Sequence, residues 1–173
     1  EVYGFKNVKL LNGGFNEWNK LNFLVSKETP DIKESNYIAS VDNKKLATKF
    51  STQIATKSPS IIIMDARKYI AYIGEESIAK RFGHIPEAIS KPATHNIATV
   101  NDFPKLKDLK ELEELYKDID KSKKIISYCD IGRVSSSNYF ALRQLGYDVA
   151  NYDASWKEWG NDSELPIVTI SKK

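Results

Sequence analysis

The sequence contains a single cysteine, Cys129, and only two histidines, His84 and His95. One cysteine excludes an internal disulfide, a paired-cysteine redox motif and a cysteine-based zinc site. Two histidines also argue against a histidine-rich metal site, so we expect a protein without a metal or another cofactor. A lone cysteine is more often a small buried apolar residue than a nucleophile. A catalytic role for Cys129 therefore has to be argued from its surroundings.

Long apolar runs and a strong charge imbalance are also missing. The longest apolar run, Ile61–Met64, is typical of a buried strand and far shorter than the roughly 20 residues of a membrane span. The net charge is only +3, without an arginine cluster, so we expect neither nucleic acid nor a membrane among the partners. The chain begins with Glu1 rather than Met, so a targeting segment is not visible. We expect a cytoplasmic protein, with the periplasm as the alternative.

Short apolar strands alternate with amphipathic helices over most of the chain. Leu106, Leu109 and Leu112 recur at helical spacing, for example, whereas the isoleucine-rich segment 60–65 is typical of a strand. We expect strands at 60–65, 124–128 and 149–152, and helices at 46–58, 105–120 and 135–145. This alternation predicts an α/β fold with a central, mostly parallel sheet flanked by helices.

An internal repeat shows how the chain is organised. Segment 7–18 resembles segment 148–159 at a constant offset, so that a valine, an aromatic residue and a closing Glu-Trp pair coincide. The second copy closes a domain because little follows it. By analogy, the first copy closes a preceding domain whose body is missing.

The repeat leads to three predicted parts. Residues 1–25 are the tail of a truncated N-terminal domain, and Val8–Leu11 within them is expected to be an exposed strand that needs a partner. Residues 26–45 are polar, lack apolar periodicity and form a linker. Residues 46–173 form the catalytic domain.

The surroundings of Cys129 favour a reactive site. A predicted strand ends at this residue, a glycine-containing loop follows, and a helix then begins with serines suited to capping. Open α/β sheets bind ligands at the carboxyl ends of their strands. The N–H groups of the loop can converge on an anion and favour the thiolate, the reactive form of cysteine. Gly132 lets the backbone fold back, and Arg133 adds positive charge near the sulfur.

The chain resembles the rhodanese superfamily, and in particular the C-terminal catalytic half of a tandem-domain thiosulfate or 3-mercaptopyruvate sulfurtransferase. The motifs that carry the resemblance are Leu11–Trp18, Asp-Ala-Arg at 65–67, Gly-His-Ile-Pro at 83–86, the loop at 128–132, Leu-Gly-Tyr at 145–147 and Ser-Trp-Lys-Glu-Trp at 155–159. The resemblance implies a rhodanese-like fold. It also implies that the missing N-terminal half is a partner, lost or held as a separate chain.

The resemblance further implies a sulfurtransferase mechanism. A small anionic donor gives its outer sulfur to Cys129, the catalytic residue, and the resulting persulfide passes it to cyanide or a thiol. Arg67 and Arg81 are candidates for binding the donor, whereas Asp65 and His84 are interpreted as structural. The predicted substrate-binding set is completed by residues of the loop and of the closing motif, namely Asp130, Ile131, Gly132, Arg133, Val134 and Trp156.

Two positions depart from the family pattern, and they leave alternatives open. Asp130 stands where thiosulfate-using members often carry a basic residue, so thiosulfate, mercaptopyruvate and polysulfide all stay open as donors. Glu87 replaces a glycine, which predicts a local change of the turn. A phosphatase on the same fold would need an arginine in place of Ser135. A rhodanese-like sulfur carrier or docking module with little turnover is the alternative function.

Overall fold

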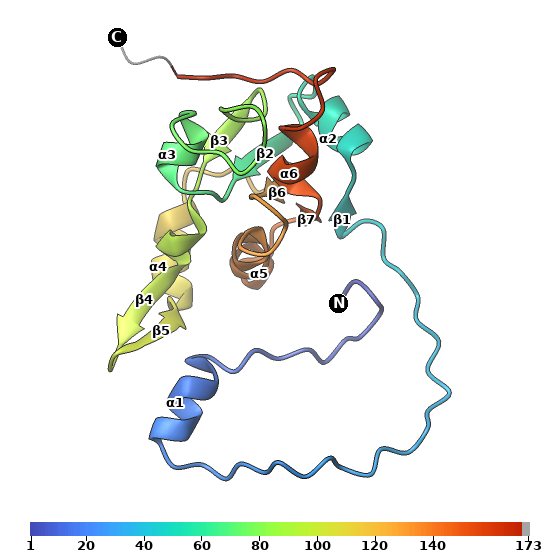
Figure 1. Ribbon diagram of the computed structural model, residues 1–173, viewed down its shortest axis with the longest axis vertical. Coiled ribbons are helices and arrows are strands. Elements are labelled where there is room, and N and C mark those ends of the chain that lie inside the picture. Colours follow the sequence, from blue (N-terminus) through green and yellow to red (C-terminus); the bar gives the residue numbers. More distant parts are fainter. Residues whose placement is uncertain (171–173) are drawn as a thin grey trace.

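The computed structural model describes residues 1–170 and has a central sheet that is parallel throughout. Its five strands lie in the order β1 (Leu46–Ala47), β7 (Val149–Tyr152), β6 (Lys124–Tyr128), β2 (Ile61–Asp65) and β3 (Ala88–Ser90). A separate antiparallel pair joins β4 (Ile97–Val100) to β5 (Phe103–Leu106). The predicted α/β fold with a mostly parallel sheet is confirmed (Figure 1).

Helices cover both faces of the sheet (Figure 1). One core cluster contains residues of α2 (Lys49–Ala55) and α6 (Ser155–Trp159), and the other contains residues of α4 (Leu109–Tyr116) and α5 (Ser135–Gln144). Neighbouring strand residues alternate between these clusters: Ile63 belongs to the first and Met64 to the second. Because both faces are buried, the central strands have to be apolar on both sides, which accounts for their isoleucine-rich sequences.

Two of the predicted helices begin later than expected, for local reasons. Leu46 and Ala47 pair with β7 as a short edge strand, so α2 begins only after Thr48, whose side chain accepts a hydrogen bond from the Ser51 N–H. Likewise, Asp108 and Glu111 form a capping box that fixes the start of α4. Side-chain caps supply partners for the unpaired N–H groups of a first helical turn, and they define these starts more sharply than periodicity does.

The two copies of the internal repeat adopt the same local structure. The first copy forms α1 (Gly14–Lys20), and the second forms α6. Both helices begin with a residue at positive φ, Gly14 at 67° and Ser155 at 53°. The indole N–H of Trp18 donates to the Leu24 carbonyl at 3.1 Å, and that of Trp159 donates to the Pro166 carbonyl at 2.9 Å. The sequence similarity thus reflects a shared structural unit.

The surroundings of the two copies differ. Trp156 is fully buried in the core, whereas Phe15, its counterpart in the first copy, is 62% exposed. Val8–Leu11, predicted as a strand, forms none in this chain, although its counterpart in the repeat is β7. The segment instead lies near the β4–β5 pair, where Asn12 accepts a 2.8 Å hydrogen bond from the Leu106 N–H.

The segment predicted as a linker, 26–45, contains no helix or strand before β1. The predicted end of the last part, residues 171–173, lies outside the described residues. Among residues 1–170, none of the helices has both the length and the apolar character needed to cross a membrane.

The repeat provides a matched pair of substitutions. Trp159→Ala is expected to lower the free energy of unfolding by about 3–5 kcal/mol, because it empties a fully buried site. Trp18→Ala, at the partly exposed equivalent position, should cost less than about 1 kcal/mol. Urea denaturation of both variants checks this difference, and equal losses would show that the first copy is as firmly packed as the second.

Candidate active site

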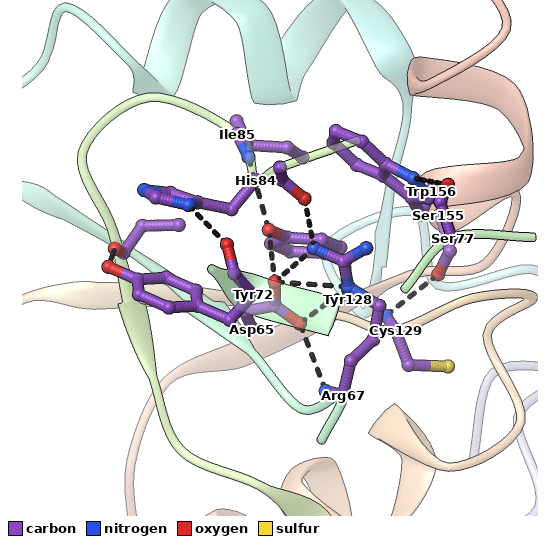
Figure 2. A network of polar contacts seen from close by, with 12 residues as sticks. Asp65, Arg67, Tyr72, Ser77, His84, Ile85, Tyr128, Cys129, Ser155 and Trp156 are labelled. Carbon is purple, nitrogen blue, oxygen red and sulfur yellow. Dashed lines mark hydrogen bonds and ion pairs between the residues drawn. The ribbon is translucent and has the colours of Figure 1, made fainter. Parts of the chain in front are cut away.

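Cys129 follows directly after β6, at the carboxyl end of the sheet. Its side chain is only 1% exposed and packs in a small cluster with Ala66 and Ala93. Its N–H donates to the Ser155 hydroxyl at 3.1 Å, and its carbonyl accepts from the Trp156 N–H at 3.0 Å (Figure 2). The backbone of the cysteine is thus attached to the start of α6 on both sides, which fixes where the thiol lies.

The loop after Cys129 has unused hydrogen-bond donors. Within residues 1–170, the backbone N–H groups of residues 130–133 donate to no other residue. Gly132 adopts a φ of 79°, and its carbonyl accepts hydrogen bonds from the Ser135 hydroxyl at 2.9 Å and the Asn151 amide at 3.2 Å. A tight loop with several free N–H groups is the arrangement that binds anions in backbone nests.

A cavity of about 500 Å³ lies beside this loop. Its wall includes Ala66 and Ala93, the two residues that pack against Cys129, so the thiol lies directly behind that wall. The lining residues come from the segments that follow β2, β3 and β6: Ala66, Arg67, Lys68, Ala71, Glu76, Pro92, Ala93, Thr94, Ile97, Asp130, Arg133, Val134 and Ser137. Its volume is within the usual range for small-molecule sites.

A buried ion pair lies beside the cavity, and Arg67 is its member in the lining. The Arg67 Nη2 donates to Asp65 Oδ2 at 2.6 Å, and both side chains are fully buried. The Tyr128 hydroxyl donates to the same carboxylate oxygen at 2.6 Å (Figure 2). Burial opposes the charge of Arg67, but hydrogen bonding and attraction from Asp65 outweigh it and raise the pKa of the guanidinium. Burial, together with the charge of Asp65, raises the pKa of Tyr128 well above its usual value. The tyrosine therefore stays a donor.

Arg67 has one donor left over. Its Nη2 also donates to the Gly83 carbonyl at 2.7 Å, but its Nη1 is buried and has no hydrogen-bond partner among the described residues. The guanidinium lies over the Trp156 ring, 4.4 Å from the centroid, which adds a cation–π attraction. Arg67 therefore combines a fixed position with a permanent charge beside the cavity, and its unpaired Nη1 is buried.

Trp156 and Arg81 lie outside the cavity lining. The Trp156 indole is fully buried and donates to the Ser77 hydroxyl at 2.9 Å, so it supports Arg67 from behind. The guanidinium of Arg81 donates to backbone carbonyls at the end of α6 and just after it, those of Trp159, Gly160, Asp162 and Leu165. Both side chains hold the closing segment in place, although the sequence motifs had suggested contact with the substrate.

The predicted loop residues divide into two groups. Asp130, Arg133 and Val134 line the cavity, whereas Ile131 and Gly132 do not. Burial raises the pKa of Asp130, and the charges of Asp65 and Glu76 add to this increase.

The two residues interpreted as structural lie in the polar network of Figure 2. Asp65 holds Arg67 and Tyr128. His84 Nδ1 contacts the Tyr72 carbonyl at 2.7 Å, and its ring stacks on that of Tyr72.

Ser155 is the site residue that the sequence reasoning missed. Its hydroxyl accepts from the Cys129 N–H and donates to the Tyr152 carbonyl at 2.6 Å, so it ties the cysteine to the end of β7. It is fully buried and has a φ of 53°, which is unusual for a serine. The available signal was its alignment with Gly14 in the repeat, because a glycine at that position indicates positive φ.

Comparison with known proteins gives consistent matches. A family model described as a rhodanese-like domain matches residues 46–162. A putative thiosulfate sulfurtransferase of Haloferax volcanii is 35% identical over 178 residues, which cover 96% of this chain and 61% of that protein. A thiosulfate sulfurtransferase of Corynebacterium glutamicum is 30% identical over 184 residues, covering 98% of this chain and 60% of that protein. The chain thus spans about three fifths of the length of these relatives.

Solved structures share the fold. The anaerobic ergothioneine biosynthesis enzyme from Chlorobium limicola, in complex with trimethyl histidine, matches with a TM-score of 0.84 at 24% identity. The match covers 99% of this chain and 43% of that enzyme. At this level of identity the likeness shows the arrangement of the backbone alone.

The loop glycine gives a sharp test of the geometry. A Cβ at Gly132 would lie 2.5 Å from the Asp153 carbonyl oxygen, whereas a Cβ at Gly146, also at positive φ, would meet nothing within 4 Å. Gly146→Ala should therefore cost only about 1 kcal/mol of backbone strain. Gly132→Ala should cost clearly more and displace the loop. Thermal unfolding of the two variants measures the difference, and equal losses would contradict the described loop.

Proposed function

This chain belongs to the rhodanese family, and we propose that it is a sulfurtransferase in which Cys129 carries the transferred sulfur as a persulfide. The observation that carries the proposal is the position of Cys129, at the carboxyl end of a central parallel strand and next to a loop of free N–H groups. The names of the thiosulfate sulfurtransferase relatives support the same class of reaction.

The proposed reaction consists of two displacements. In the first, the Cys129 thiolate attacks the outer sulfur of a donor such as thiosulfate. A new S–S bond forms to Cys129, the donor's S–S bond breaks, and sulfite leaves with the bonding electron pair. In the second, cyanide or a thiolate attacks the outer sulfur of the persulfide and releases the Cys129 thiolate. The terminal sulfur at this site is anionic in both states, as the Cys129 thiolate before the first transfer and as the outer sulfur of the persulfide after it. The free N–H groups of residues 130–133 are placed to stabilise that charge.

The donor cavity is proposed to use a subset of the residues suggested by the motifs. Arg67 and Arg133 are its cationic donor-binding residues, and Val134 contributes apolar wall. Gly132 shapes the loop, and Ser155 is a positioning residue because it acts through the backbone of Cys129. Arg81 and Trp156 act through the packing of α6 and Arg67.

The alternative function is a sulfur carrier or docking module with little turnover. A carrier would accept one sulfur per chain and release it slowly, whereas an enzyme cycles repeatedly. The 500 Å³ cavity beside the loop that follows the cysteine favours the enzyme, because a carrier that hands sulfur to a protein partner needs no cavity for a small donor.

Cys129→Ser separates the catalytic cysteine from a structural one. The substitution is expected to reduce steady-state production of thiocyanate from thiosulfate and cyanide by at least about 10³-fold, as expected for loss of a nucleophile. Circular dichroism and urea denaturation should stay close to the parent, because serine nearly matches the size of cysteine. Turnover within a factor of about two of the parent would contradict the proposed role.

We further propose that residues 1–25 complete a second rhodanese-type domain, with residues 26–45 as the linker to the catalytic domain. In the repeat, Val8–Leu11 corresponds to β7, which lies between β1 and β6 in the sheet. Here the apolar side chains of the first copy are exposed, from 51% at Val8 to 62% at Leu10 and Phe15. The counterparts of Val8 and Phe15 in the second copy, Val149 of β7 and Trp156 of α6, are buried against a domain, which indicates the kind of partner that the first copy fits.

Hydrogen exchange tests this arrangement in the native protein. If Val8–Leu11 joins a second sheet, its amides should exchange as slowly as those of β7. In the present chain on its own they should exchange as fast as those of residues 26–45. Fast amide exchange at Val8–Leu11 both in the native protein and in this chain alone would contradict the second domain.

A further inference from the structure

One wall of the cavity also covers Cys129. The cysteine packs against Ala93, which begins a short 3₁₀ helix, Ala93–Asn96, and other residues of the segment 92–97 line the cavity. Asn96, at the far end of that helix, is fully buried and does not belong to the lining. A buried amide is costly without hydrogen-bond partners, so the partners of Asn96 indicate what holds this wall.

Asn96 connects the wall to two helices. Its Nδ2 donates to Asn138 Oδ1 of α5 at 2.7 Å, and its Oδ1 accepts from the Tyr116 hydroxyl of α4 at 2.7 Å. The Nδ2 of Asn138 in turn donates to the Lys91 carbonyl, just after β3, at 2.8 Å. Asn138 is fully buried, and Tyr116 is 1% exposed. These side chains therefore form a buried polar chain that runs from α4 through the wall to α5 and back to the start of the wall segment.

The direction of this chain is fixed at one end. The Lys91 carbonyl can only accept, so Asn138 has to present its NH₂ group there and its oxygen to Asn96. Asn96 then presents its NH₂ group to Asn138 and its oxygen to Tyr116, whose hydroxyl supplies the last donor. Burial raises the pKa of Tyr116, so this hydroxyl keeps its proton. A chain with a single direction holds its members in a single geometry.

The two ends of the wall segment are held differently. At its start, the backbone is tied to the end of β2: the Lys91 N–H donates to the Asp65 carbonyl and the Ala93 N–H donates to the Ala66 carbonyl, both at 2.9 Å. At its end, the side chain of Asn96 makes the connection to α4 and α5. The amide pair thus holds the part of the wall that the sheet does not reach.

The amide pair also sets the spacing between two walls of the cavity. The segment 92–97 is one wall, and the start of α5, with Val134 and Ser137 in the lining, is the other. Asn138 follows directly after Ser137 and is bonded to the first wall. Cys129 is only 1% exposed, so a sulfur that is added to it has to fit between the thiol and these walls. Their spacing therefore determines how a donor approaches the thiol.

We propose that Asn96 and Asn138 are positioning residues for sulfur transfer, which hold the Ala93 wall against Cys129 at the spacing that the reaction needs. The inference rests on the proposed function of Cys129 and adds to it two residues that belong neither to the sequence motifs nor to the cavity lining. Both act through the wall, without contact with the reacting sulfur. A misplacement of about 1 Å in a reacting group can cost about 10²-fold in rate, so a small shift of the wall is sufficient to affect the reaction.

Asn138→Ala tests the assignment, and alanine is the residue most compatible with the interior of α5. Because Cys129 is the only cysteine, the reaction of the native protein with dithiodipyridine, an uncharged aromatic disulfide, reports access to this thiol alone. Loss of the amide pair should loosen the wall. Cys129 should then react at least about tenfold faster than in the parent, whereas kcat/KM for thiocyanate formation from thiosulfate and cyanide should fall by about tenfold or more.

Tyr116→Phe is a milder second variant, which decides the question if Asn138→Ala does not fold. It removes only the hydroxyl at the end of the chain and leaves Asn96 Oδ1 without its donor. Both rates should change in the same directions as in Asn138→Ala, by about threefold.

Thr52→Ala is the control for a general loss of stability. It removes a fully buried hydroxyl that donates to the Thr48 carbonyl at 2.9 Å, in α2, whose Ala55 belongs to the other core cluster. This variant should lower Tm and leave both rates within about twofold of the parent.

Two results would overturn the proposal. One is thiol labelling of Asn138→Ala and Tyr116→Phe that is no faster than that of Thr52→Ala, which would assign the amide pair to the fold alone. The other is faster labelling with an unchanged kcat/KM, because the wall would then cover the thiol without positioning the donor. Neither result affects the sulfurtransferase itself, which fails only if Cys129 of the parent takes up no sulfur.

Discussion

The buried ion pair between Asp65 and Arg67 organises the end of the sheet at which Cys129 lies. Asp65 closes β2 and also accepts the hydroxyl of Tyr128, the residue before the cysteine, so the pair connects two neighbouring strands. Arg67 extends the network to the Gly83 carbonyl and to the face of Trp156. Removing one partner of a buried ion pair typically costs about 3–5 kcal/mol. The position of the thiol therefore depends on a charge pair that does not contact it.

The sequence predicts the sheet better than it predicts the helix starts. The strands at 124–128 and 149–152 are confirmed with their expected bounds, because apolar runs in a doubly covered parallel sheet have few alternatives. Helix starts depend on single side-chain caps at Thr48 and Asp108, which periodicity does not detect. Glu87, which replaces the usual glycine of the motif, still adopts a φ of 62°. The turn there keeps the backbone conformation that a glycine would allow.

The candidate site is predicted only in part, because motifs specify residue types and not the directions in which the side chains point. The position of Cys129 at the end of a strand, and the loop after it, follow from the order of the predicted elements along the sequence. Arg81 belongs to a motif as clear as that of Arg67, yet its donors point to the carbonyls around the end of α6. Lys68 and Glu76 belong to no motif and line the cavity only because the segment after β2 folds back. Tertiary packing determined these placements.

The central claim is that sulfur passes through Cys129. Its most direct test is the mass of the peptide containing Cys129 after the protein has been mixed with a sulfur donor and separated from it. A gain of about 32 Da, one sulfur atom, on that peptide and its loss after addition of cyanide are the results that this account predicts. An unchanged peptide mass with thiosulfate, mercaptopyruvate, polysulfide and cysteine persulfide would contradict it.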